Sequence, residues 1–494
     1  MKKILFAASE SVPFIKTGGL ADVIGSLPKY FDKEEYDVRV VLPKYMCIPE
    51  NYRSEMEYIS HFYMYYNGRN RYVGILKYEL NGIPYYFIDN EEYFSGPTPY
   101  SDHFYDLEKF GFFSKAVLSI LPSIDFQPDI IHCHDWHTGL IPVYLRSLFA
   151  ADLFYTSMRS IMTIHNLRFQ GTWNIEDIKR MTGLPDYLFT PDKLEAYKDA
   201  NYLKGGIVYA DYVTTVSESY VEEVKTPFYG EKLDKLLWAR SNNFFGILNG
   251  IDYDEFNPAD DPALYQNFTV SDFRKKKKKN KTELQKELGL TVDPHMMMIG
   301  IVSRMTDQKG FDLIQRVLEE LMTDEFQLVV LGTGEWSYEE MFKHFAEKYP
   351  GKVSANLFYS EAFSHKIYAA CDAFLMPSLF EPCGLSQLIA LRYGAVPIVR
   401  ETGGLKDTVV PYNEYENTGT GFSFRNYNAH EMMKIIRYAE SVYYDNRRRW
   451  NQLVERGMKQ DFSWNVSAKK YEKLYDQLTR SEERRVGKEC RSRW

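Results

Sequence analysis

The residues best suited to chemistry begin at a glycine pair near the start of the chain. An apolar run, Lys3–Ala8, leads to the segment Lys16–Val23, in which Lys16 and Thr17 precede Gly18 and Gly19. Glycines after a strand let a ligand approach the backbone closely, and a following helix N-terminus offers free N–H groups to an anion. One such turn is weak evidence for a binding site.

A similar arrangement recurs far downstream. The apolar run Ala373–Met376 leads to the segment Glu381–Leu385, and Thr402–Leu405 carries a second glycine pair. Arg304 and Lys309 lie between the two halves and supply positive charge. Two glycine turns in separate α/β halves, with cations available, predict a phosphate-bearing ligand held in a cleft.

Composition narrows the class of protein. The chain has 494 residues, enough for two or three domains, and no apolar run approaches the roughly 18–20 residues of a membrane helix. A net charge of −8 argues against a general nucleic-acid binder. Lys2 and Lys3 precede an apolar stretch, but polar residues interrupt it so early that a buried first strand is the better interpretation than a signal peptide.

The cysteines and a basic run also indicate the class of protein. The five cysteines are scattered and odd in number, which is typical of a reducing cytosol, so we expect a cytoplasmic protein without membrane or nucleic-acid partners. The basic run Arg274–Lys279 continues into a charged segment, and a solvated helix or linker is favoured there over an anion-binding patch. Aromatic residues make up 16% of the chain, a faint indication of carbohydrate contacts beside the simpler role of filling cores.

Two series of strands alternate with helices. In the first half, short apolar runs with little alternation are typical of parallel strands covered on both faces. These runs are Ile4–Ala8, Val38–Leu42, Tyr85–Ile88, Ile130–Cys133, Ile161–Ile164 and Tyr212–Val216, with helices expected over Phe110–Leu121 and Gly139–Leu148. The second series comprises Met297–Val302, Phe326–Leu331, Ala373–Met376 and Val396–Val399, with helices over Asp312–Leu321, Tyr338–Tyr349, 430–445 and 466–479.

The predicted fold is therefore α/β, with two facing Rossmann-like domains and the active site in the cleft between them. The first domain is expected over residues 1–255, a linker and entry segment over 256–295, and the second domain over 296–480, with its last helix returning to the first domain. Residues 481–494 are rich in arginine without apolar periodicity, so we expect a disordered tail or a cloning or assembly artefact.

Taken in order and spacing, the motifs resemble those of the bacterial glycogen synthases, the ADP-glucose-using starch/glycogen synthase family of retaining glycosyltransferases with the GT-B type of fold. The resemblance runs from Met1 to about Arg480. The motifs that carry it are Lys16–Val23, His134–His137, Thr163–Leu167, Leu203–Gly206, Leu248–Asp252, Ser303–Arg304, Gln308–Gly310, Pro377–Leu385 and Arg400–Leu405.

The resemblance implies a reaction: glucose passes from ADP-glucose to the non-reducing end of an α-1,4-glucan such as glycogen, with retention of configuration. The catalytic residues would be Lys16, His165, Arg304, Lys309 and Glu381, with Arg304, Lys309 and Lys16 on the pyrophosphate and Glu381 and His165 on the donor glucose. Charge stabilisation on the departing diphosphate is the main demand of this chemistry.

Further contacts follow from the same resemblance. The donor-binding set adds Gly18, Gly19, Asn249, Tyr359, Cys383, Gly384, Leu385, Thr402, Gly403 and Gly404. Asp22, Tyr100 and Asp135 are expected to contact the acceptor or a sugar. No cofactor is expected, because ADP-glucose is itself a substrate.

Metal binding is the alternative reading of the histidines. Strand alternation puts His132 and His134 on one face, with Asp135 and His137 following, but the expected chemistry needs no metal, so none is predicted.

Three departures from the family pattern concern specificity. Phe358 stands where the family usually has glycine, just before Tyr359, which is expected to stack on adenine. Lys232 and Lys235 replace glycines common in the loop 229–237, past which acceptor glucan is expected to run. Donor preference is therefore the part of the prediction that the sequence supports least.

Two rival functions stay open. One is a retaining transferase of the same architecture that uses UDP-glucose or another acceptor, and the other is a glucan-binding scaffold without catalysis. The charged residues expected at the site are all present, which argues against the scaffold. A dehydrogenase is excluded because no G-x-G-x-x-G follows either first strand.

Overall fold

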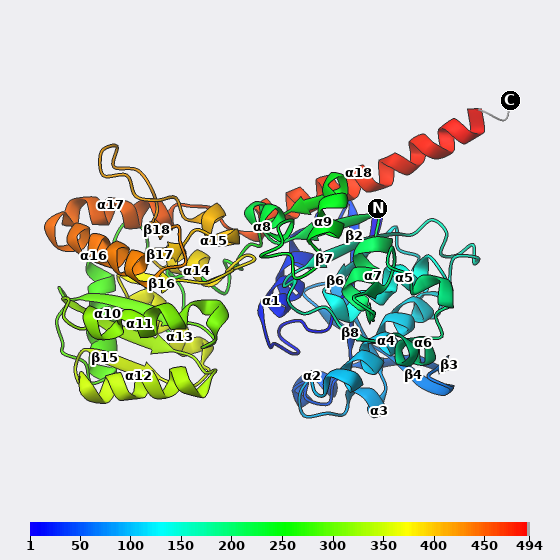
Figure 1. Ribbon diagram of the computed structural model, residues 1–494, viewed down its shortest axis with the longest axis horizontal. Helices are drawn as coiled ribbons and strands as arrows, with labels where there is room; N and C mark the ends of the chain where they lie inside the picture. The colour runs from blue at the N-terminus through cyan, green and yellow to red at the C-terminus, as the bar shows by residue number, and fades with distance from the viewer. Residues whose placement is uncertain (492–494) are drawn as a thin grey trace. The chain divides into compact units, whose positions relative to one another are not determined.

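The computed structural model describes the backbone of residues 1–491 and the side chains of residues 1–479, and it divides into two compact units (Figure 1). The first unit comprises residues 1–216 and 221–248 and the helix that begins at Trp464. The second comprises residues 217–220 and 249–463. Each unit is described by itself, and the cleft predicted between two domains stays a prediction, as does the tail expected over 481–494, whose side chains lie outside the described residues.

The first unit is built on a nine-stranded sheet with the order β12-β11-β7-β6-β1-β2-β5-β4-β3. Its strands are β1 (Lys2–Ala7), β2 (Tyr36–Pro43), β3 (Glu57–Tyr66), β4 (Arg69–Leu80), β5 (Ile83–Asp89), β6 (Ile130–His134), β7 (Arg159–Ile164), β11 (Tyr212–Thr215) and β12 (Phe244–Gly246). Strand β1 pairs in parallel with β2 on one side and β6 on the other, so the chain changes direction across the sheet between β1 and β6. Ligands of doubly wound sheets bind at such a switch point, beyond the carboxyl ends of the strands.

The antiparallel edge of this sheet was not predicted. Strands β3 and β4 form a hairpin closed by Asn67-Gly68, and Asn81-Gly82 joins β4 to β5, with positive φ at all four residues. Asn-Gly between strands is the common sequence of a tight hairpin turn. That signal was in the sequence, but the tyrosine-rich strands around it did not look like the buried parallel runs elsewhere.

Helices and a small second sheet complete the first unit. The small sheet joins β8 (Thr172–Asn174), β10 (Asp199–Asn201) and β9 (Glu195–Ala196). The helices are α1 (Gly19–Ser26), α2 (Glu50–Arg53), α3 (Glu91–Phe94), α4 (His103–Ile120), α5 (Leu140–Leu145), α6 (Ile175–Thr182), α7 (Tyr202–Tyr209), α8 (Glu218–Val224), α9 (Asp234–Ala239) and α18 (Trp464–Arg491), of which α8 begins in the second unit. Helix α18 is tied to the main sheet by its buried Tyr475, whose hydroxyl lies 2.8 Å from Nδ1 of His132 on β6.

The second unit has a six-stranded, wholly parallel sheet. Its order is β15-β14-β13-β16-β17-β18, the 3-2-1-4-5-6 order of the Rossmann fold, with the switch point between β13 and β16. The strands are β13 (Met297–Val302), β14 (Phe326–Leu331), β15 (Val353–Asn356), β16 (Ala373–Met376), β17 (Val396–Arg400) and β18 (Phe422–Phe424). Every strand predicted from the sequence is present, and the predicted α/β class with parallel sheets in two domains is confirmed.

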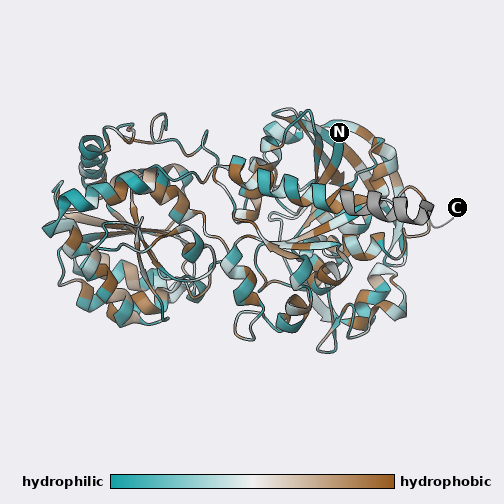
Figure 2. Cartoon of the chain, turned by 90° about the horizontal axis from the view of Figure 1, so that it is seen from above, coloured by the Kyte–Doolittle hydropathy of each residue, from teal (hydrophilic) through white to brown (hydrophobic). Residues whose placement is uncertain are grey.

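Helices lie on both faces of this second sheet (Figure 1). They are α10 (Phe273–Glu287), α11 (Phe311–Leu321), α12 (Trp336–Lys348), α13 (Glu361–Ala370), α14 (Ser386–Arg392), α15 (Gly403–Thr408), α16 (Ala429–Asp445) and α17 (Arg447–Met458). Coloured by hydropathy, the strands in each unit are mainly hydrophobic and the outer helix faces hydrophilic (Figure 2). None of the helices within the described residues is long and apolar enough to cross a membrane.

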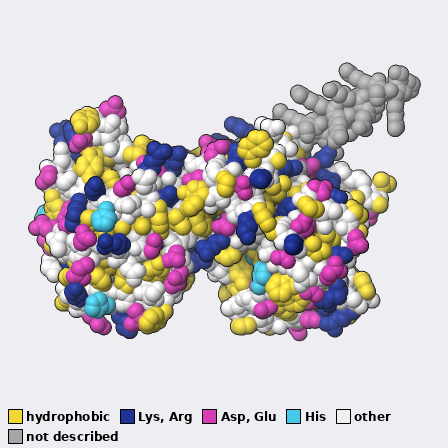
Figure 3. All heavy atoms as spheres, viewed as in Figure 1, with side chains coloured by type: hydrophobic (Ala, Val, Ile, Leu, Met, Phe, Trp, Pro, Cys, Tyr) yellow, Lys and Arg dark blue, Asp and Glu magenta, His cyan; other side chains and the backbone are white. Residues whose placement is uncertain are grey.

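The basic run on α10 is only partly solvated, so the expectation of a solvated charged segment is wrong for one of its lysines. Lys277 is buried, and its ammonium donates to the carbonyl oxygens of Tyr368, Ala369 and Tyr393 at 2.8–3.2 Å. These carbonyls end helices α13 and α14, where unsatisfied C=O groups favour a cation. Elsewhere, lysine and arginine are interspersed with acidic side chains over the visible face of each unit (Figure 3).

Candidate active site

In the first unit, the glycine turn after β1 is organised by a carboxylate that the sequence analysis did not select. Glu10 is buried, and its Oε2 accepts hydrogen bonds from the backbone N–H of Thr17 at 2.5 Å and from the Thr17 hydroxyl at 2.8 Å. The backbone N–H of Gly18 also donates to this carboxylate. Burial raises the pKa of Glu10 above its ordinary value, although these hydrogen bonds oppose the rise.

Three further residues expected at the site, Lys16, Asp22 and Tyr100, lie near Glu10. Lys16 forms an ion pair with Asp22 of α1, with 2.8 Å between Nζ and Oδ1. The hydroxyl of Tyr100 lies 2.9 Å from Oγ of Ser9, and its ring stacks on His137 with 5.0 Å between centroids. The turn therefore holds Lys16, Asp22 and Tyr100 in one polar cluster at the carboxyl end of β1.

Asp135 and His165 follow the neighbouring strands β6 and β7. Oδ1 of Asp135 accepts the backbone N–H of His165 at 2.7 Å, and the backbone N–H of Asp135 donates to Thr163. Asp135 begins the 3₁₀ turn Trp136–Thr138 with φ +55° and ψ −179°, a combination that is essentially confined to glycine, and such strain concentrates at functional sites. Burial, aided by the nearby charge of Glu10, raises the pKa of Asp135 from 3.8 to about 7.

The histidines around Asp135 are held as neutral rings. Nδ1 of His134 lies 2.9 Å from Nε2 of His165, and the rings of His132 and His134 stack at 4.3 Å. Burial lowers the pKa of His132 and of His165 to about 3. Among the described residues no three His, Cys, Asp or Glu side chains are grouped so that they could hold a metal ion.

In the second unit, the site residues follow β13 and β16, the two strands at the switch point. Lys309 ends a short 3₁₀ turn, Asp307–Lys309, and its Nζ lies 2.6 Å from Oε2 of Glu381. Oε2 of Glu381 also accepts the hydroxyl of Ser378 at 3.1 Å. The carboxylate is buried, so this ion pair lies largely out of solvent at the carboxyl ends of β13 and β16.

The second glycine pair packs directly against the Glu381 turn. A Cβ at Gly403 would lie 2.0 Å from the carbonyl oxygen of Glu381, and one at Gly404 would lie 2.0 Å from that of Cys383. Gly403 also has a positive φ of +42°. Only glycine fits at these two positions. The close packing of the two turns therefore requires the glycine pair in Thr402–Leu405.

Cys383 and Gly384 are fixed by their surroundings. The side-chain amide of Gln387 donates to the carbonyl oxygens of Cys383 at 3.0 Å and Gly384 at 2.8 Å. The backbone N–H of Asn249 points to the Cys383 sulfur, and burial raises the pKa of this thiol to about 12, so it stays protonated. Oδ1 of Asn249 is buried and has no hydrogen-bond partner among the described residues, so it can accept one from a ligand.

Two expected donor contacts lie outside this packed centre. Arg304, directly after β13, is exposed, and Tyr359 is 74% exposed. Phe358 is about half exposed, at 47%, and packs against Phe363 with 5.7 Å between ring centroids. The structure thus places Arg304 at the switch point, whereas the nucleotide contact of Tyr359 stays a prediction.

Within each unit, the structure brings most of the expected residues together. The first unit gathers Lys16, Gly18, Gly19, Asp22, Tyr100, Asp135 and His165 at the carboxyl ends of β1, β6 and β7. The second gathers Asn249, Lys309, Glu381, Cys383, Gly384, Leu385, Thr402, Gly403 and Gly404. Glu10 is the residue that the sequence reasoning missed, although its place just after the first strand was a usable signal.

Two family models together match most of the chain. The family model described as "Starch synthase catalytic domain" matches residues 3–239, and the one described as "Glycosyl transferases group 1" matches residues 280–456. A glycogen synthase of Lachnospira eligens is 66% identical over 97% of this chain and 100% of its own length. One of Geobacillus stearothermophilus is 49% identical over 97% of this chain and 99% of its own length.

Solved structures give the same picture. The catalytic domain of starch synthase IV from Arabidopsis thaliana, bound to ADP and acarbose, matches with a TM-score of 0.90 and 34% identity, covering 97% of this chain and 99% of its own. A sucrose-phosphate synthase from Thermosynechococcus elongatus matches with a TM-score of 0.61 at 16% identity over 97% of this chain and 100% of its own, a likeness of fold alone. The resemblance found in the sequence is confirmed.

Proposed function

Because the chain belongs to the glycogen synthase family of glycosyltransferases, we propose that it takes its glucose from ADP-glucose and adds it to the non-reducing 4-OH of an α-1,4-glucan. The α configuration is retained in this proposal. Glucosyl transfer to a glucan is the activity of the family, and the identity of the donor is the proposed part.

The observation that carries the donor is the likeness to starch synthase IV, whose structure contains ADP, over 97% of this chain. The cations at the switch point of the second unit suit such a ligand. Arg304 and Lys309 both follow β13, and Arg304 is exposed. Nζ of Lys309 lies 2.6 Å from Oε2 of Glu381, which follows β16. A diphosphate that develops negative charge as it leaves is stabilised by fixed cations of this kind.

The second unit supplies groups for the donor in this proposal. Lys309 and Arg304 bind the diphosphate, while the second Glu381 oxygen accepts hydrogen bonds from glucose hydroxyls. Gly403 and Gly404, at the start of α15, hold the Glu381 turn in place by close packing, and the N–H of Gly404 donates to the carbonyl oxygen of Glu381 at 3.1 Å. Asn249 offers its unpartnered Oδ1.

The first unit supplies mainly uncharged groups. Asp135 accepts hydrogen bonds from the sugar, His165 stays a neutral ring with its backbone carbonyl near the reacting carbon, and Lys16 adds a further cation for the diphosphate. Neutral groups suit this place, because the chemistry needs charge stabilisation on the departing diphosphate more than it needs a strong base.

The proposed step needs no cofactor and no metal. The acceptor 4-OH attacks the anomeric carbon on the face from which ADP departs, the bond from that carbon to the phosphate oxygen breaks, and the acceptor proton passes to a phosphate oxygen of ADP. One glycosidic bond forms, one sugar–phosphate bond breaks, and no electrons are exchanged with another reagent.

The test is incorporation of labelled glucose into glycogen with ADP-glucose and UDP-glucose offered separately, without added metal. We expect incorporation from ADP-glucose. Preference for UDP-glucose would keep the family and overturn the donor, and glycogen binding without transfer from either would favour a scaffold.

A further inference from the structure

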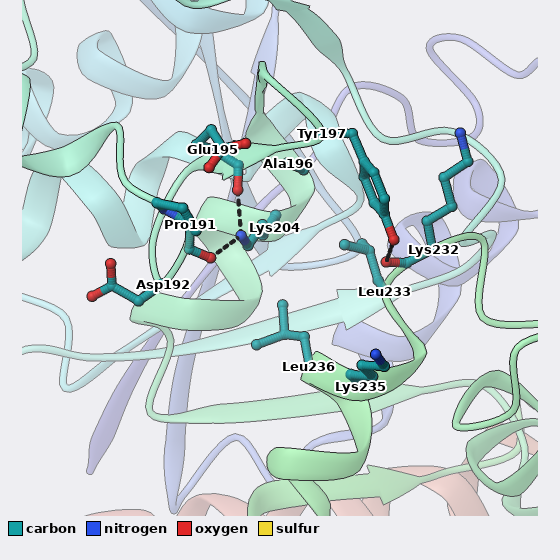
Figure 4. Close-up of a pocket in the computed structure, with 10 residues that line it drawn as sticks. All are labelled: Pro191, Asp192, Glu195, Ala196, Tyr197, Lys204, Lys232, Leu233, Lys235 and Leu236. Carbon is teal, nitrogen blue, oxygen red and sulfur yellow. Dashed lines mark hydrogen bonds between the residues drawn. The ribbon is translucent and has the colours of Figure 1, made fainter.

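A pocket of about 370 Å³ lies in the first unit, between α7 and the segment 232–236 that leads into α9 (Figure 4). The buried ammonium of Lys204 donates to the carbonyl oxygens of Pro191 and Glu195 in its wall. Because the pocket borders the loop 229–237, past which the acceptor glucan is expected to run, it is part of the acceptor side of the proposed reaction.

Two buried histidines on β6 are not explained in this way. The rings of His132 and His134 stack with 4.3 Å between centroids, and neither side chain is exposed. Both ring nitrogens of His132 have partners, since Nδ1 lies 2.8 Å from the Tyr475 hydroxyl and Nε2 lies 2.6 Å from Oγ1 of Thr163. His134 is bonded at Nδ1, which lies 2.9 Å from Nε2 of His165. One of the two rings is therefore tied to the fold, and the other to a residue of the candidate site.

The ring of His134 is held in one orientation by its surroundings. Phe6 of β1 stacks on it with 5.5 Å between centroids and 16° between planes, and His132 covers it as well. The backbone N–H of His134 donates to Oγ1 of Thr138 at 2.7 Å, which fixes the end of β6. In a core packed in this manner a ring has little room to turn, so Nδ1 stays directed at His165.

The contact between His134 and His165 joins two uncharged rings. Burial lowers the pKa of His134 well below its ordinary value and lowers that of His165 to about 3. A neutral imidazole has one N–H donor and one acceptor nitrogen. Only two arrangements are then open: His134 donates from Nδ1 to Nε2 of His165, or His165 donates from Nε2 to Nδ1 of His134.

The other ring nitrogen of His134 decides between these arrangements. Nε2 is buried, and it has no hydrogen-bond partner among the described residues. If His134 accepted at Nδ1, its own proton would lie on Nε2 as an orphaned buried N–H, which is rare and costly in folded proteins. Donation from Nδ1 leaves only a lone pair without a partner. His134 is therefore the donor, and His165, which accepts at Nε2, carries its proton on Nδ1.

This proton matters because His165 stands at the site. His165 directly follows β7, and its backbone N–H donates to Oδ1 of Asp135 at 2.7 Å. Its side chain is partly exposed, whereas His134 is fully buried. With the proton on Nδ1, the ring offers a fixed N–H to a lone pair of a sugar hydroxyl, while the other tautomer would need the hydroxyl's own proton. A donor fixed in advance needs no rearrangement when the sugar reacts.

We propose that His134 is a positioning residue for glucosyl transfer, whose Nδ1–H holds His165 in the Nδ1-protonated tautomer so that it donates to the donor glucose. His134 itself touches no substrate and acts through His165. The inference rests on the proposed function for the sugar beside His165. The tautomer, however, is a property of the free chain and is measured without substrate.

The first readout is NMR of the full chain with isotope-labelled histidine nitrogens, because the shifts of the two ring nitrogens differ between the Nδ1–H and Nε2–H tautomers. The signals of His165 are identified by their loss in His165→Gln. We expect the Nδ1–H tautomer at His165 in the wild type. The Nε2–H tautomer there would overturn the inference directly.

The second readout is glucose transfer to glycogen by variants of the stacked pair. His134→Phe keeps a ring in the stack and removes the donor, and His134→Asn keeps an N–H near the place of Nδ1. His132→Phe is the matched control, because His132 is equally buried and stacked but has no hydrogen bond to His165. Thermal unfolding of each variant measures the loss of stability separately.

His134→Phe should lower kcat about 10- to 100-fold, the usual cost of losing a group that orients a histidine, with the KM for glycogen unchanged. His134→Asn should keep kcat close to the wild type, and His132→Phe should lose stability but not kcat. Equal values of kcat in His134→Phe and His132→Phe would overturn the positioning role, as would equal losses in His134→Phe and His134→Asn. Failure of ADP-glucose as donor would leave the NMR result intact, so the two proposals fail separately.

Discussion

The two halves of the candidate site solve different electrostatic problems. In the first unit, burial keeps His165 neutral and raises the pKa of Asp135 to about 7. The Glu10 carboxylate accepts backbone N–H groups of the glycine turn. In the second unit, the centre is an ion pair between Lys309 and Glu381, with the exposed Arg304 nearby in sequence after β13. Apart from the Lys16–Asp22 ion pair on its glycine turn, the first unit keeps neutral hydrogen-bonding groups where a sugar is expected to react, and the second unit keeps charge where a diphosphate is expected to leave.

The largest effect is expected from removing the ion pair of the second unit. Lys309→Ala removes the cation from the buried Glu381 carboxylate, and kcat should fall by about 10²- to 10³-fold, as for the loss of one group that stabilises a transition state. Glu381→Ala should lower turnover similarly. Steady-state transfer of glucose to glycogen measures both.

The control for this pair lies in the same unit. Lys343→Ala removes an exposed lysine from an ion pair with Glu340 on α12, and it should change turnover little. Near-wild-type turnover in both Lys309→Ala and Glu381→Ala would show that the charged centre has been assigned wrongly.

A smaller effect is expected in the neutral half, where Glu10 positions the turn that carries Lys16. Glu10→Ala leaves the backbone N–H groups of Thr17 and Gly18 without their buried acceptor, which should lower the free energy of unfolding by about 2 kcal/mol. The KM for ADP-glucose should rise because Lys16 loses its support. Thermal unfolding and donor titration are the measurements, with the exposed Glu34→Ala as control.

Equal changes in Glu10→Ala and Glu34→Ala would contradict a positioning role for Glu10. A loss of stability with an unchanged KM for ADP-glucose would limit Glu10 to the fold.

The last prediction concerns the pH dependence of stability and sharpens the contrast in protonation. Between pH 3.8 and about 7, folded Asp135 holds a proton that the unfolded chain has released, so this carboxyl lowers stability as the pH rises. Buried His165, with its pKa lowered to about 3, acts in the opposite sense, because the unfolded chain gains a proton as the pH falls through 6.5. Asp135→Asn should therefore gain stability relative to the wild type as the pH rises from 4 to 7.

Melting temperatures of the variant and the wild type across this pH range give the difference directly. Asp125→Asn is the matched control, since Asp125 is an exposed aspartate that also has positive φ. Parallel curves for Asp135→Asn and the wild type would mean that Asp135 is ionised in the folded chain throughout.

Much of the fold could be predicted because its signals are local. Parallel strands such as β13 and β14 are continuous apolar runs, and the predicted ends of these two strands are confirmed. The β3–β4 hairpin was missed although Asn67-Gly68 marks it, since its half-exposed strands lack that continuous pattern. Helix α5 proved shorter than expected, Leu140–Leu145 in place of Gly139–Leu148.

The site was predicted as a set of residues but not as an arrangement. Glycine pairs, the lysines beside them and Glu381 are visible in the sequence because each needs a particular residue type at a particular turn. Nothing local distinguishes Lys277, which closes two helix ends, from the solvated lysines on either side of it. Its partners lie more than 90 residues away in the chain.

The sequence by itself determined most of the parallel strands, the two glycine turns and the family to which the chain belongs, because these depend on neighbouring residues along the chain. Only the tertiary structure decided that Glu10 orders the first turn and that a pocket lies between α7 and α9. It also decided that burial shifts the pKa values of Asp135 and His165 toward their uncharged forms. Burial and protonation depend on groups that folding brings together from distant segments, and no local pattern records them.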